Sequence, residues 1–287
     1  MTPEAAQTVA TVLEEATRRL REAGVPDPRR EAASLLAFVL GTDRGGVVAR
    51  KPDLVEAGAA ARYAELIAAR ALRVPLQHLE GRAEFRGLEF EVGPDVLIPR
   101  PETEDLVQVI LDAGLPESAR VADLGTGSGC ISVALAVGRG SWQLVAVNLS
   151  AAALRVAERN AAKHGVAERI AFVKSDFAAP EAAWHGAFDA VVSNPPYIPE
   201  EEWRGLEPEV RDHEPKSALV PGLTGNEAYE VIVRAAAAML RPGGLLALEL
   251  GWKSEEPVRA TVGSSGFNEI AVKPDLQGIP RVLTARR

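Results

Sequence analysis

Two patterns of apolar and polar positions divide the chain, and the first pattern is helical. Over residues 9–20, apolar side chains recur every three or four positions, so that they fall on one face of a helix. A second helical segment begins at Asp27-Pro28 and stops at Gly41, and a third, rich in alanine and arginine, covers residues 54–72. We therefore expect a small all-helical domain over residues 1–80.

The pattern changes after this helical part. Phe85, Leu88, Phe90 and Val92 are separated by polar residues and a glycine. This spacing predicts a β-hairpin, and we expect residues 81–98 to form a hairpin connector.

From residue 99 onward, short apolar runs typical of buried strands alternate with helical segments. The expected strands lie at 121–124, 143–147, 170–173, 189–192, 245–250, 270–272 and 281–285. Strands that alternate with helices of this length predict an α/β domain over residues 99–287, with a mostly parallel sheet covered on both faces. No helix separates the last two strands, so these two could pair antiparallel.

The charge balance weighs against a partner held mainly through phosphate groups. The 287 residues carry 32 Lys and Arg against 40 Asp and Glu, a formal charge of -8, whereas nucleic-acid-binding proteins usually present a basic face. No run approaches ~20 uninterrupted apolar residues. We expect no stable nucleic-acid binding and no membrane segment. With one cysteine and no signal-peptide pattern, we expect a reducing, cytoplasmic location.

Two residue types that often carry catalytic chemistry are uninformative here. The four histidines, at positions 78, 164, 185 and 213, lack metal-ligand spacing, so we expect no metal site. Cys130 stands at the start of an expected helix, where a small packing role is favoured over that of a nucleophile.

The segment D-L-G-T-G-S-G-C, from Asp123 to Cys130, follows the first strand of the expected sheet. Its three glycines let the backbone turn sharply and come close to a ligand. A dinucleotide fingerprint needs its third glycine three residues after the second, and no phosphate-binding Gly-Lys-Ser/Thr is present. The loop therefore suits a ligand without a pyrophosphate, such as S-adenosylmethionine. Asp123 would orient the turn or, through water, the ligand's ammonium group, and the alternative is a glycine-rich turn without a ligand.

Two further strand ends carry candidate cofactor contacts. In such folds the second strand usually presents a carboxylate to the ribose hydroxyls, and Asn148 holds that position here. An amide lacks the charge of a carboxylate, so cofactor binding should be weaker by about 1–2 kcal/mol, unless Asn148 is only a turn residue. Asp176 and Phe177 could give a polar contact and an apolar wall to the adenine, although Phe177 could equally belong to the core.

The segment V-V-S-N-P-P-Y-I-P-E, residues 191–200, leaves a buried strand at the same edge of the sheet as the glycine loop. Pro195 and Pro196 cannot donate hydrogen bonds and fix φ, so they hold the carbonyls of the turn as acceptors, and Asn194 adds a side-chain oxygen. Two convergent acceptors bind the hydrogens of an NH2 group on a π-system and direct its lone pair toward a methyl donor. Tyr197 can stack on the flat substrate group. The motif therefore predicts methylation of a planar nitrogen, either a carboxamide or the exocyclic amine of a nucleobase.

Three segments together resemble the HemK/PrmC family of protein-glutamine N5-methyltransferases: D-L-G-T-G-S-G, S-N-P-P-Y-I and V-L-I-P-R-P-E-T-E-D-L-V. The likeness covers nearly the whole chain. I-P-R-P-E-T-E is the most discriminating segment, because N-P-P-Y also occurs in DNA adenine methyltransferases. The resemblance implies a seven-stranded, Rossmann-like S-adenosylmethionine-dependent methyltransferase domain after the helical domain. It also implies methylation of the glutamine in the Gly-Gly-Gln motif of class 1 peptide chain release factors.

The resemblance also assigns site residues. It places against S-adenosylmethionine the loop residues Gly125, Thr126, Gly127, Ser128 and Gly129, together with Asn148, Phe177 and Asn194. The substrate glutamine would meet Asn194, Pro195, Pro196 and Tyr197, and the expected catalytic residues are Asn194, Pro195 and Tyr197. Family members usually carry an acidic residue in place of Asn148, and residues 221–227 and 249–255 also depart from the family pattern. The helical domain would form part of the docking surface for the release factor, and we expect a monomer.

Other functions remain open. The same class of enzyme could act on a glutamine of a ribosomal protein or on adenine N6 in nucleic acid, although the net acidity and I-P-R-P-E-T-E count against nucleic acid. A non-catalytic binding module could also keep the fold, with Asn148 as a sign of a decayed cofactor site. The intact glycine loop and N-P-P-Y weigh against that alternative.

Overall fold

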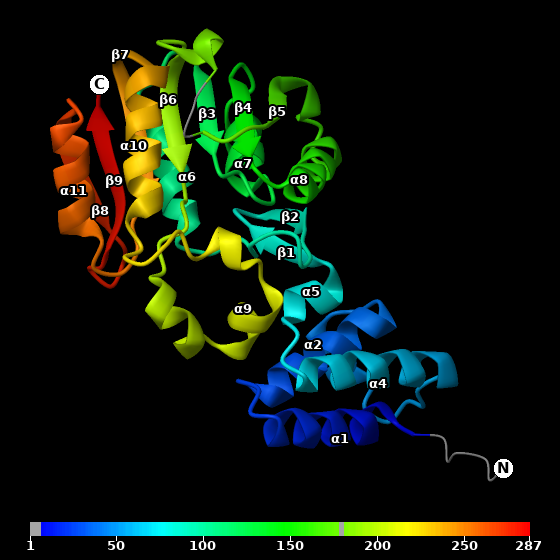
Figure 1. The fold of residues 1–287 in the computed structure, drawn as a ribbon. Helices are drawn as coiled ribbons and strands as arrows, with labels where there is room; N and C mark the ends of the chain where they lie inside the picture. The colour runs from blue at the N-terminus through cyan, green and yellow to red at the C-terminus, as the bar shows by residue number, and fades with distance from the viewer. Residues whose placement is uncertain (1–6, 178–180) are drawn as a thin grey trace. The chain divides into compact units, whose positions relative to one another are not determined.

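The computed structural model describes residues 7–177 and 181–287, which form two compact units (Figure 1). The helical unit contains the described residues up to Gly81 together with Glu207–His213. The sheet unit contains the described residues of Arg82–Leu206 together with Glu214–Arg287. The segment 207–213 thus belongs to the helical unit, although the chain on either side of it belongs to the sheet unit.

The helical unit is built from α1 (Val9–Glu22), α2 (Pro28–Leu40), α3 (Arg44–Ala49), α4 (Ala57–Ala71), α5 (Leu76–Glu80) and α9 (Pro208–His213). Its core contains the apolar faces that the helical spacing predicts, and Leu20, Leu35 and Leu36 have no exposed surface. Gly41 ends α2 in the left-handed conformation, as its place after the last apolar residue predicts. The spacing does not predict α3, α5 and α9, because helices of five or six residues are too short to show a period.

A partly buried network of ion pairs, centred on the buried Arg70, holds segment 207–213 within the helical unit. Arg70 of α4, with a side chain 3% exposed, donates to Glu209 Oε1 over 2.7 Å and also pairs with Glu31 of α2. Arg73 donates to Glu209 Oε2 over 2.6 Å. Burial alone would raise the pKa of Glu209, but hydrogen bonds from Arg73 and Arg70 outweigh it and hold the pKa below its ordinary value. The acidic side chain is therefore held, partly buried, in its charged, paired form.

The sheet unit contains a seven-stranded sheet with the order β5-β4-β3-β6-β7-β9-β8. Its strands are β3 (Arg120–Leu124), β4 (Gln143–Asn148), β5 (Ile170–Lys174), β6 (Phe188–Ser193), β7 (Leu240–Glu249), β8 (Asn268–Pro274) and β9 (Pro280–Arg286). The first five strands in the spatial order are parallel, and β9 runs antiparallel to both β7 and β8. The predicted α/β class, with a mostly parallel sheet and an antiparallel final pair, is confirmed.

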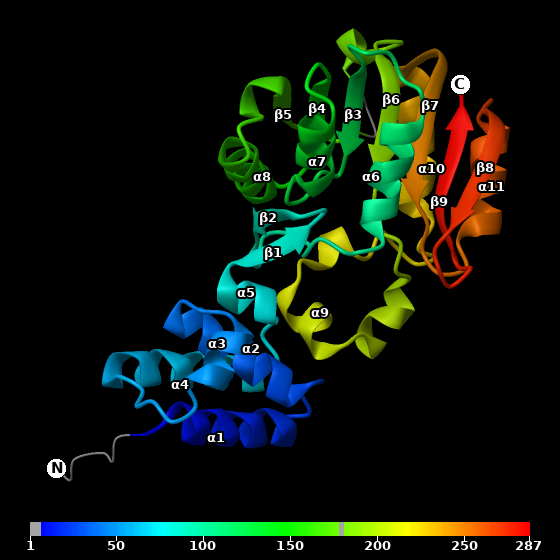
Figure 2. The ribbon, with the colours of Figure 1, turned by 180° about the vertical axis from the view of Figure 1, so that it is seen from behind.

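Helices cover both faces of this sheet. One face carries α6 (Thr103–Asp112), α7 (Cys130–Gly138) and α8 (Ala151–Lys163), and the other carries α10 (Glu227–Met239) and α11 (Glu255–Ser264). The opposite views show α10 in front of the sheet in Figure 1 and α6 in front of it in Figure 2. Ala190 and Val192 of β6 enter the core on the α6 side, while Val191 enters the core on the α10 side. Because both faces are buried, the strands read as continuous apolar runs in the sequence.

The predicted hairpin is present in the sheet unit, where β1 (Arg82–Phe85) pairs antiparallel with β2 (Leu88–Glu91). Phe85 and Phe90 pack into the core on the α6 side. The 3-10 helices are η1 (Ala167–Arg169), η2 (Ala182–Trp184), η3 (Glu200–Gly205) and η4 (Lys216–Ala218). Within residues 7–177 and 181–287, no helix is both long enough and apolar enough to cross a membrane.

Candidate active site

The predicted site residues meet at one edge of the sheet. Because β5, β4, β3, β6 and β7 are parallel, their carboxyl ends lie together, and ligands of open α/β sheets bind at that edge. The glycine loop follows β3, Asn148 ends β4, Asp176 and Phe177 follow β5, and Asn194 follows β6. Glu249, which the sequence analysis leaves without a role, ends β7 at the same edge.

Asp123 organises the glycine loop from inside the protein. It is fully buried, and its Oδ2 accepts hydrogen bonds from Thr126 Oγ1 and Ser132 Oγ, both over 2.7 Å. Its Oδ1 is buried without a partner among the described residues. Burial raises the pKa of Asp123, and the two hydroxyl hydrogen bonds oppose that shift. One carboxylate oxygen therefore shapes the turn, and the other remains available to a water molecule or a ligand group.

The glycines of the loop meet two different requirements. All three have positive φ, at 85° for Gly125, 54° for Gly127 and 81° for Gly129, a region that other residues adopt rarely. A Cβ on Gly129 would lie 2.9 Å from Ala157 Cβ, so this glycine allows α8 to approach the loop. A Cβ on Gly125 would meet nothing within 4 Å, so the space beside it is open. The loop thus combines a close helix contact with an open backbone face.

The polar side chains within the loop point inward. Thr126 is buried and its hydroxyl is bound to Asp123, while Ser128 is 2% exposed and its carbonyl oxygen accepts from Asn160 Nδ2 over 2.9 Å. Contacts of these two residues with a ligand would therefore come from the backbone. Cys130 is also buried, and burial raises the pKa of its thiol to about 12, which leaves it unreactive at neutral pH.

The ends of β4 and β5 supply three more predicted residues. Asn148 is half-buried, and its side-chain amide makes no hydrogen bond within the described part of the chain. Asp176 is exposed, whereas Phe177 is half-buried and packs against the core on the α10 side. Phe177 therefore combines a core contact with a partly open face.

The amide of Asn194 is held from the neighbouring helix. Ser193 Oγ donates to the Leu124 carbonyl over 2.5 Å, which joins the ends of β6 and β3 just before the asparagine. Asn194 is half-buried, and its Nδ2 donates to Thr103 Oγ1 over 3.0 Å. Thr103 is the first residue of α6 and is 2% exposed. The motif I-P-R-P-E-T-E thus reaches the N-P-P-Y motif through this threonine.

Tyr197 packs closely against two glycines, one from segment 221–227 and one from segment 249–255. A Cβ on Gly225 would lie 2.5 Å from the Tyr197 carbonyl oxygen, and a Cβ on Gly251 would lie 2.6 Å from Tyr197 Cδ2. The amides of Tyr197 and Ile198 both donate to the Leu219 carbonyl, over 3.1 and 2.9 Å. Burial raises the pKa of the Tyr197 hydroxyl, so the ring is neutral at physiological pH. Segments 221–227 and 249–255 therefore supply the space that the N-P-P-Y loop occupies.

Glu249 completes a chain of hydrogen bonds behind Asn194. It is 1% exposed, and its Oε2 accepts from Thr103 Oγ1 over 2.6 Å. Burial raises its pKa to about 7, with Glu102 acting in the same direction, while the Thr103 hydrogen bond, Arg281 and Arg100 act in the opposite one. An acidic residue inside the apolar run L-L-A-L-E-L was the available sequence signal for this site residue.

A second buried glutamate fixes the segment that leads into Thr103. Glu214, with a side chain 1% exposed, accepts from the Ile98 amide over 3.0 Å and from Arg100 Nη2 over 2.5 Å. Both partners belong to the segment I-P-R-P. The backbone before α6 is therefore held in place by a charged hydrogen bond and a backbone hydrogen bond.

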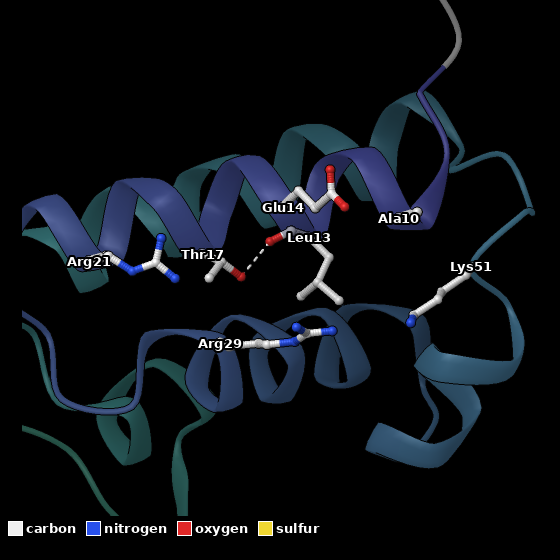
Figure 3. A pocket seen from close by; sticks show the side chains of 7 residues that line it. All are labelled: Ala10, Leu13, Glu14, Thr17, Arg21, Arg29 and Lys51. Atoms are coloured by element: carbon white, nitrogen blue, oxygen red, sulfur yellow. Dashed lines mark hydrogen bonds between the residues drawn. The ribbon is translucent and has the colours of Figure 1, made fainter.

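A pocket in the helical unit lacks this arrangement. A pocket of about 270 Å³ in the helical unit is lined by Arg21, Arg29, Lys51 and Glu14 (Figure 3). Its buried hydroxyl, Thr17 Oγ1, already donates to the Leu13 carbonyl over 2.7 Å. Within residues 7–177 and 181–287, no group of three His, Cys, Asp or Glu side chains could hold a metal ion. The arrangement suited to group transfer is the one at the sheet edge.

Comparisons with known proteins agree on one family. Residues 11–81 match the family described as PrmC N-terminal domain, and residues 102–205 match the family described as Methyltransferase small domain. The release factor glutamine methyltransferase of Nitratidesulfovibrio vulgaris is 41% identical over 282 residues, covering 98% of this chain and 95% of that protein. The protein of the same name from Mycolicibacterium smegmatis is 44% identical over 278 residues, covering 96% of this chain and 97% of that protein.

A solved structure is similar in fold. The hMettl16 catalytic domain, in complex with MAT2A 3'UTR hairpin 6, matches with a TM-score of 0.54 and 18% sequence identity. The match covers 77% of this chain and 81% of that chain. At this identity the similarity supports a shared methyltransferase fold and carries no information about the substrate.

Proposed function

The chain belongs to the family of release factor glutamine methyltransferases, and we propose that it transfers a methyl group from S-adenosylmethionine to N5 of a release-factor glutamine. The acceptor is the glutamine of the Gly-Gly-Gln motif in class 1 peptide chain release factors, and the reaction takes place in the cytoplasm. One observation carries the proposal: Asn194 Nδ2 is committed to Thr103, so Asn194 Oδ1 is left for an external NH2 group.

The residues around the glycine loop fit S-adenosylmethionine. The open face beside Gly125 admits a ligand close to the backbone, and the unpartnered Asp123 Oδ1 can accept from its ammonium group through water. Asn148 would offer its unbonded amide to the ribose hydroxyls, and Phe177 would give an apolar wall to the adenine. When bound, the cofactor supplies an electrophilic methyl group on a sulfonium ion.

Asn194 and Pro195 would hold the acceptor nitrogen. A carboxamide nitrogen is a weak nucleophile, because its lone pair is delocalised into the carbonyl group. Asn194 Oδ1 and the Pro195 carbonyl accept its two hydrogens and turn the lone pair toward the methyl carbon, so positioning supplies most of the rate enhancement. A nitrogen–carbon bond forms as the sulfur–carbon bond breaks, and the nitrogen then loses one proton to solvent. No general base is required before the attack.

Tyr197 would close the site over the glutamine. Gly251 and Gly225 hold its ring and its backbone, so the ring can stack on the planar amide without a large loss of side-chain entropy. Pro195 is buried and Pro196 is half-buried, which keeps this turn rigid. The helical unit would take part in docking the release factor.

The test uses the full-length protein with labelled S-adenosylmethionine and four acceptors. These are a class 1 release factor, the same factor with its Gly-Gly-Gln glutamine changed to alanine, ribosomal protein, and DNA. We expect label on the unmodified release factor alone. Label on DNA or on ribosomal protein, or label that persists on the alanine variant, contradicts the proposal.

Asn194→Ala tests the acceptor role. Removing one oriented polar group from a transition state costs about 10²–10³-fold in kcat, and we expect a loss in that range with cofactor affinity unchanged. Asn268→Ala is the matched control, because Asn268 is an exposed asparagine at the start of β8. Wild-type turnover by Asn194→Ala would remove Asn194 from the reaction.

A further inference from the structure

A chain of two hydrogen bonds links Asn194 to the buried carboxylate of Glu249. Asn194 Nδ2 donates to Thr103 Oγ1 over 3.0 Å, and Thr103 Oγ1 donates to Glu249 Oε2 over 2.6 Å. Thr103 is 2% exposed and Glu249 is 1% exposed, so water does not compete for these bonds. The three residues come from the loop after β6, the start of α6 and the end of β7. Three elements thus converge on a single side-chain amide.

The hydrogen-bonding capacity of each group gives this chain a direction. An ionised carboxylate can only accept, and a hydroxyl has a single hydrogen to donate. Once Thr103 donates that hydrogen to Glu249, its oxygen can only accept, so the NH2 end of Asn194 must face it. The amide oxygen of Asn194 then points the opposite way. Without this constraint, rotation of the amide by 180° would present its own hydrogens to the NH2 group of the acceptor.

We propose that Thr103 and Glu249 are positioning residues that hold the Asn194 amide with its oxygen directed at the acceptor nitrogen. This role, which rests on the proposed function, explains why a carboxylate is buried at the end of β7 without a salt bridge among the described residues. It also gives the I-P-R-P-E-T-E segment a part in the chemistry, through its threonine.

The protonation of Glu249 controls the direction of the chain. Burial and Glu102 oppose its ionised form, while the Thr103 hydrogen bond, Arg281 and Arg100 favour it, and its pKa is raised to about 7. The other titratable groups that face it are Tyr197, Tyr229 and Cys130, and burial raises the pKa of each, so they are neutral near pH 7. A protonated Glu249 can donate to Thr103, which frees the threonine hydrogen for Asn194 Oδ1. The productive orientation of the amide is then lost as the pH falls.

Turnover by four full-length variants tests the proposal. Thr103→Val keeps the shape and removes the hydroxyl, and we expect kcat to fall about 10–100-fold, with the KM for the release factor and the cofactor affinity unchanged. Thr103→Ser restores the hydroxyl and should restore turnover. Glu249→Gln offers Thr103 both an acceptor and a donor at every pH, as protonated Glu249 does. Its turnover should therefore be lower than that of the wild type at pH 8 and should no longer fall as the pH drops through about 7. Thr17→Val, which removes a buried hydroxyl in the helical unit, is the control and should leave kcat unchanged.

A readout without substrate separates failure of this proposal from failure of the proposed function. In ligand-free protein labelled with ¹⁵N, the side-chain amide signal of Asn194 is assigned by its loss in Asn194→Asp. We expect this signal to shift with pH near 7 in the wild type and to stay constant in Glu249→Gln. A wild type that methylates no acceptor defeats the proposed function, while the amide signal still tests the hydrogen-bond chain.

Three outcomes overturn the proposal. They are a wild-type kcat in Thr103→Val, a kcat of Glu249→Gln that still falls as the pH drops below about 7, and an Asn194 amide signal that does not shift with pH. If Thr103→Val does not fold, the pH profiles of Thr103→Ser and Glu249→Gln decide the question. The kcat of Thr103→Ser should fall as the pH drops below about 7, whereas that of Glu249→Gln should not.

Discussion

The helical unit and the sheet unit each enclose an acidic side chain, partly in the first and fully in the second, in opposite electrostatic settings. In the helical unit, Glu209 meets Arg70 and Arg73, and its pKa is held below the ordinary value. In the sheet unit, Glu249 has no salt bridge within the described residues and accepts from Thr103, and its pKa is raised to about 7. One carboxylate is thus fixed in its charged form, while the other titrates near neutral pH.

This difference indicates that the carboxylates of Glu209 and Glu249 have different roles. A buried ion pair holds its partners in one arrangement and keeps its charge over the whole physiological range, so it suits the attachment of segment 207–213. A buried carboxylate without a counterion destabilises the fold. Its presence behind Asn194 is explained by what it does to the Thr103 hydroxyl. The ion pairs of Glu209 thus stabilise the structure, whereas the unpaired carboxylate of Glu249 contributes to the candidate site.

Breaking the paired cluster should have the largest effect on stability. Arg70→Met removes the buried guanidinium that Glu31 and Glu209 share and leaves both partly buried carboxylates without it. We expect a loss of about 3–5 kcal/mol in the free energy of unfolding. All four tryptophans, at positions 142, 184, 203 and 252, lie in the sheet unit. We therefore expect the denaturation midpoint to shift more by far-ultraviolet circular dichroism than by tryptophan fluorescence.

The control for this change is an arginine in an exposed pair on the same helix. Arg62 pairs with Glu65 over 3.6 Å, and both side chains are more than half exposed, at 58% and 71%. Arg62→Met should change the free energy of unfolding by no more than about 0.5 kcal/mol. Equal losses of unfolding free energy in Arg70→Met and Arg62→Met would mean that burial of Arg70 does not increase the contribution of its ion pairs to stability.

Neutralising the unpaired carboxylate should stabilise the protein. The folded state holds the Glu249 proton more tightly than the unfolded chain does, so this residue makes stability fall as the pH rises from 4.5 through about 7. Glu249→Gln removes that dependence and should gain up to about 3 kcal/mol at pH 8 over the wild type. Urea denaturation of both proteins at pH 5 and pH 8 measures the change, and a variant that is less stable at pH 8 would refute this account.

The same substitution in the paired cluster should act in the opposite direction and more weakly. The lowered pKa of Glu209 means that its contribution to stability is present above the ordinary value of 4.5 and is lost as the pH falls. Glu209→Gln should therefore lose about 1–2 kcal/mol at pH 8, and the loss should shrink in acid. Glu65→Gln, at an exposed position, is the control and should have little effect at either pH.

The strands of the sheet could be predicted from the sequence, because a strand that is buried on both faces consists almost entirely of apolar residues. Ser193 and Leu124 lie at strand ends of this kind, so the edge that carries Asn194 and the glycine loop could be located as well. Helix α6 is not among the predicted elements, although its buried Leu106, Val107 and Ile110 follow a helical spacing. The segment around Glu209 is also absent, because its helix is one turn and a half long and depends on two arginines far away in the sequence.

The missing part of the candidate site could not be predicted for a different reason. Thr103 and Glu249 are 146 residues apart in the chain, and their meeting behind Asn194 depends on α6 starting beside the ends of β6 and β7. The placement of β6 next to β7 is decided by tertiary packing. The spacing of residues within each segment does not predict this strand order. In the same way, the glycines at 225 and 251 look like ordinary loop residues until the ring of Tyr197 is placed against them.

Segment 207–213 limits how genes of this family can be recombined. A crossover at the junction between Gly81 and Arg82 takes Arg70 from one parent and Glu209 from the other. A chimaera made there keeps its ion network only when both parents place these charges alike. Exchange of the helical unit as a module therefore requires a second, short insert from the same parent, carrying residues 207–213.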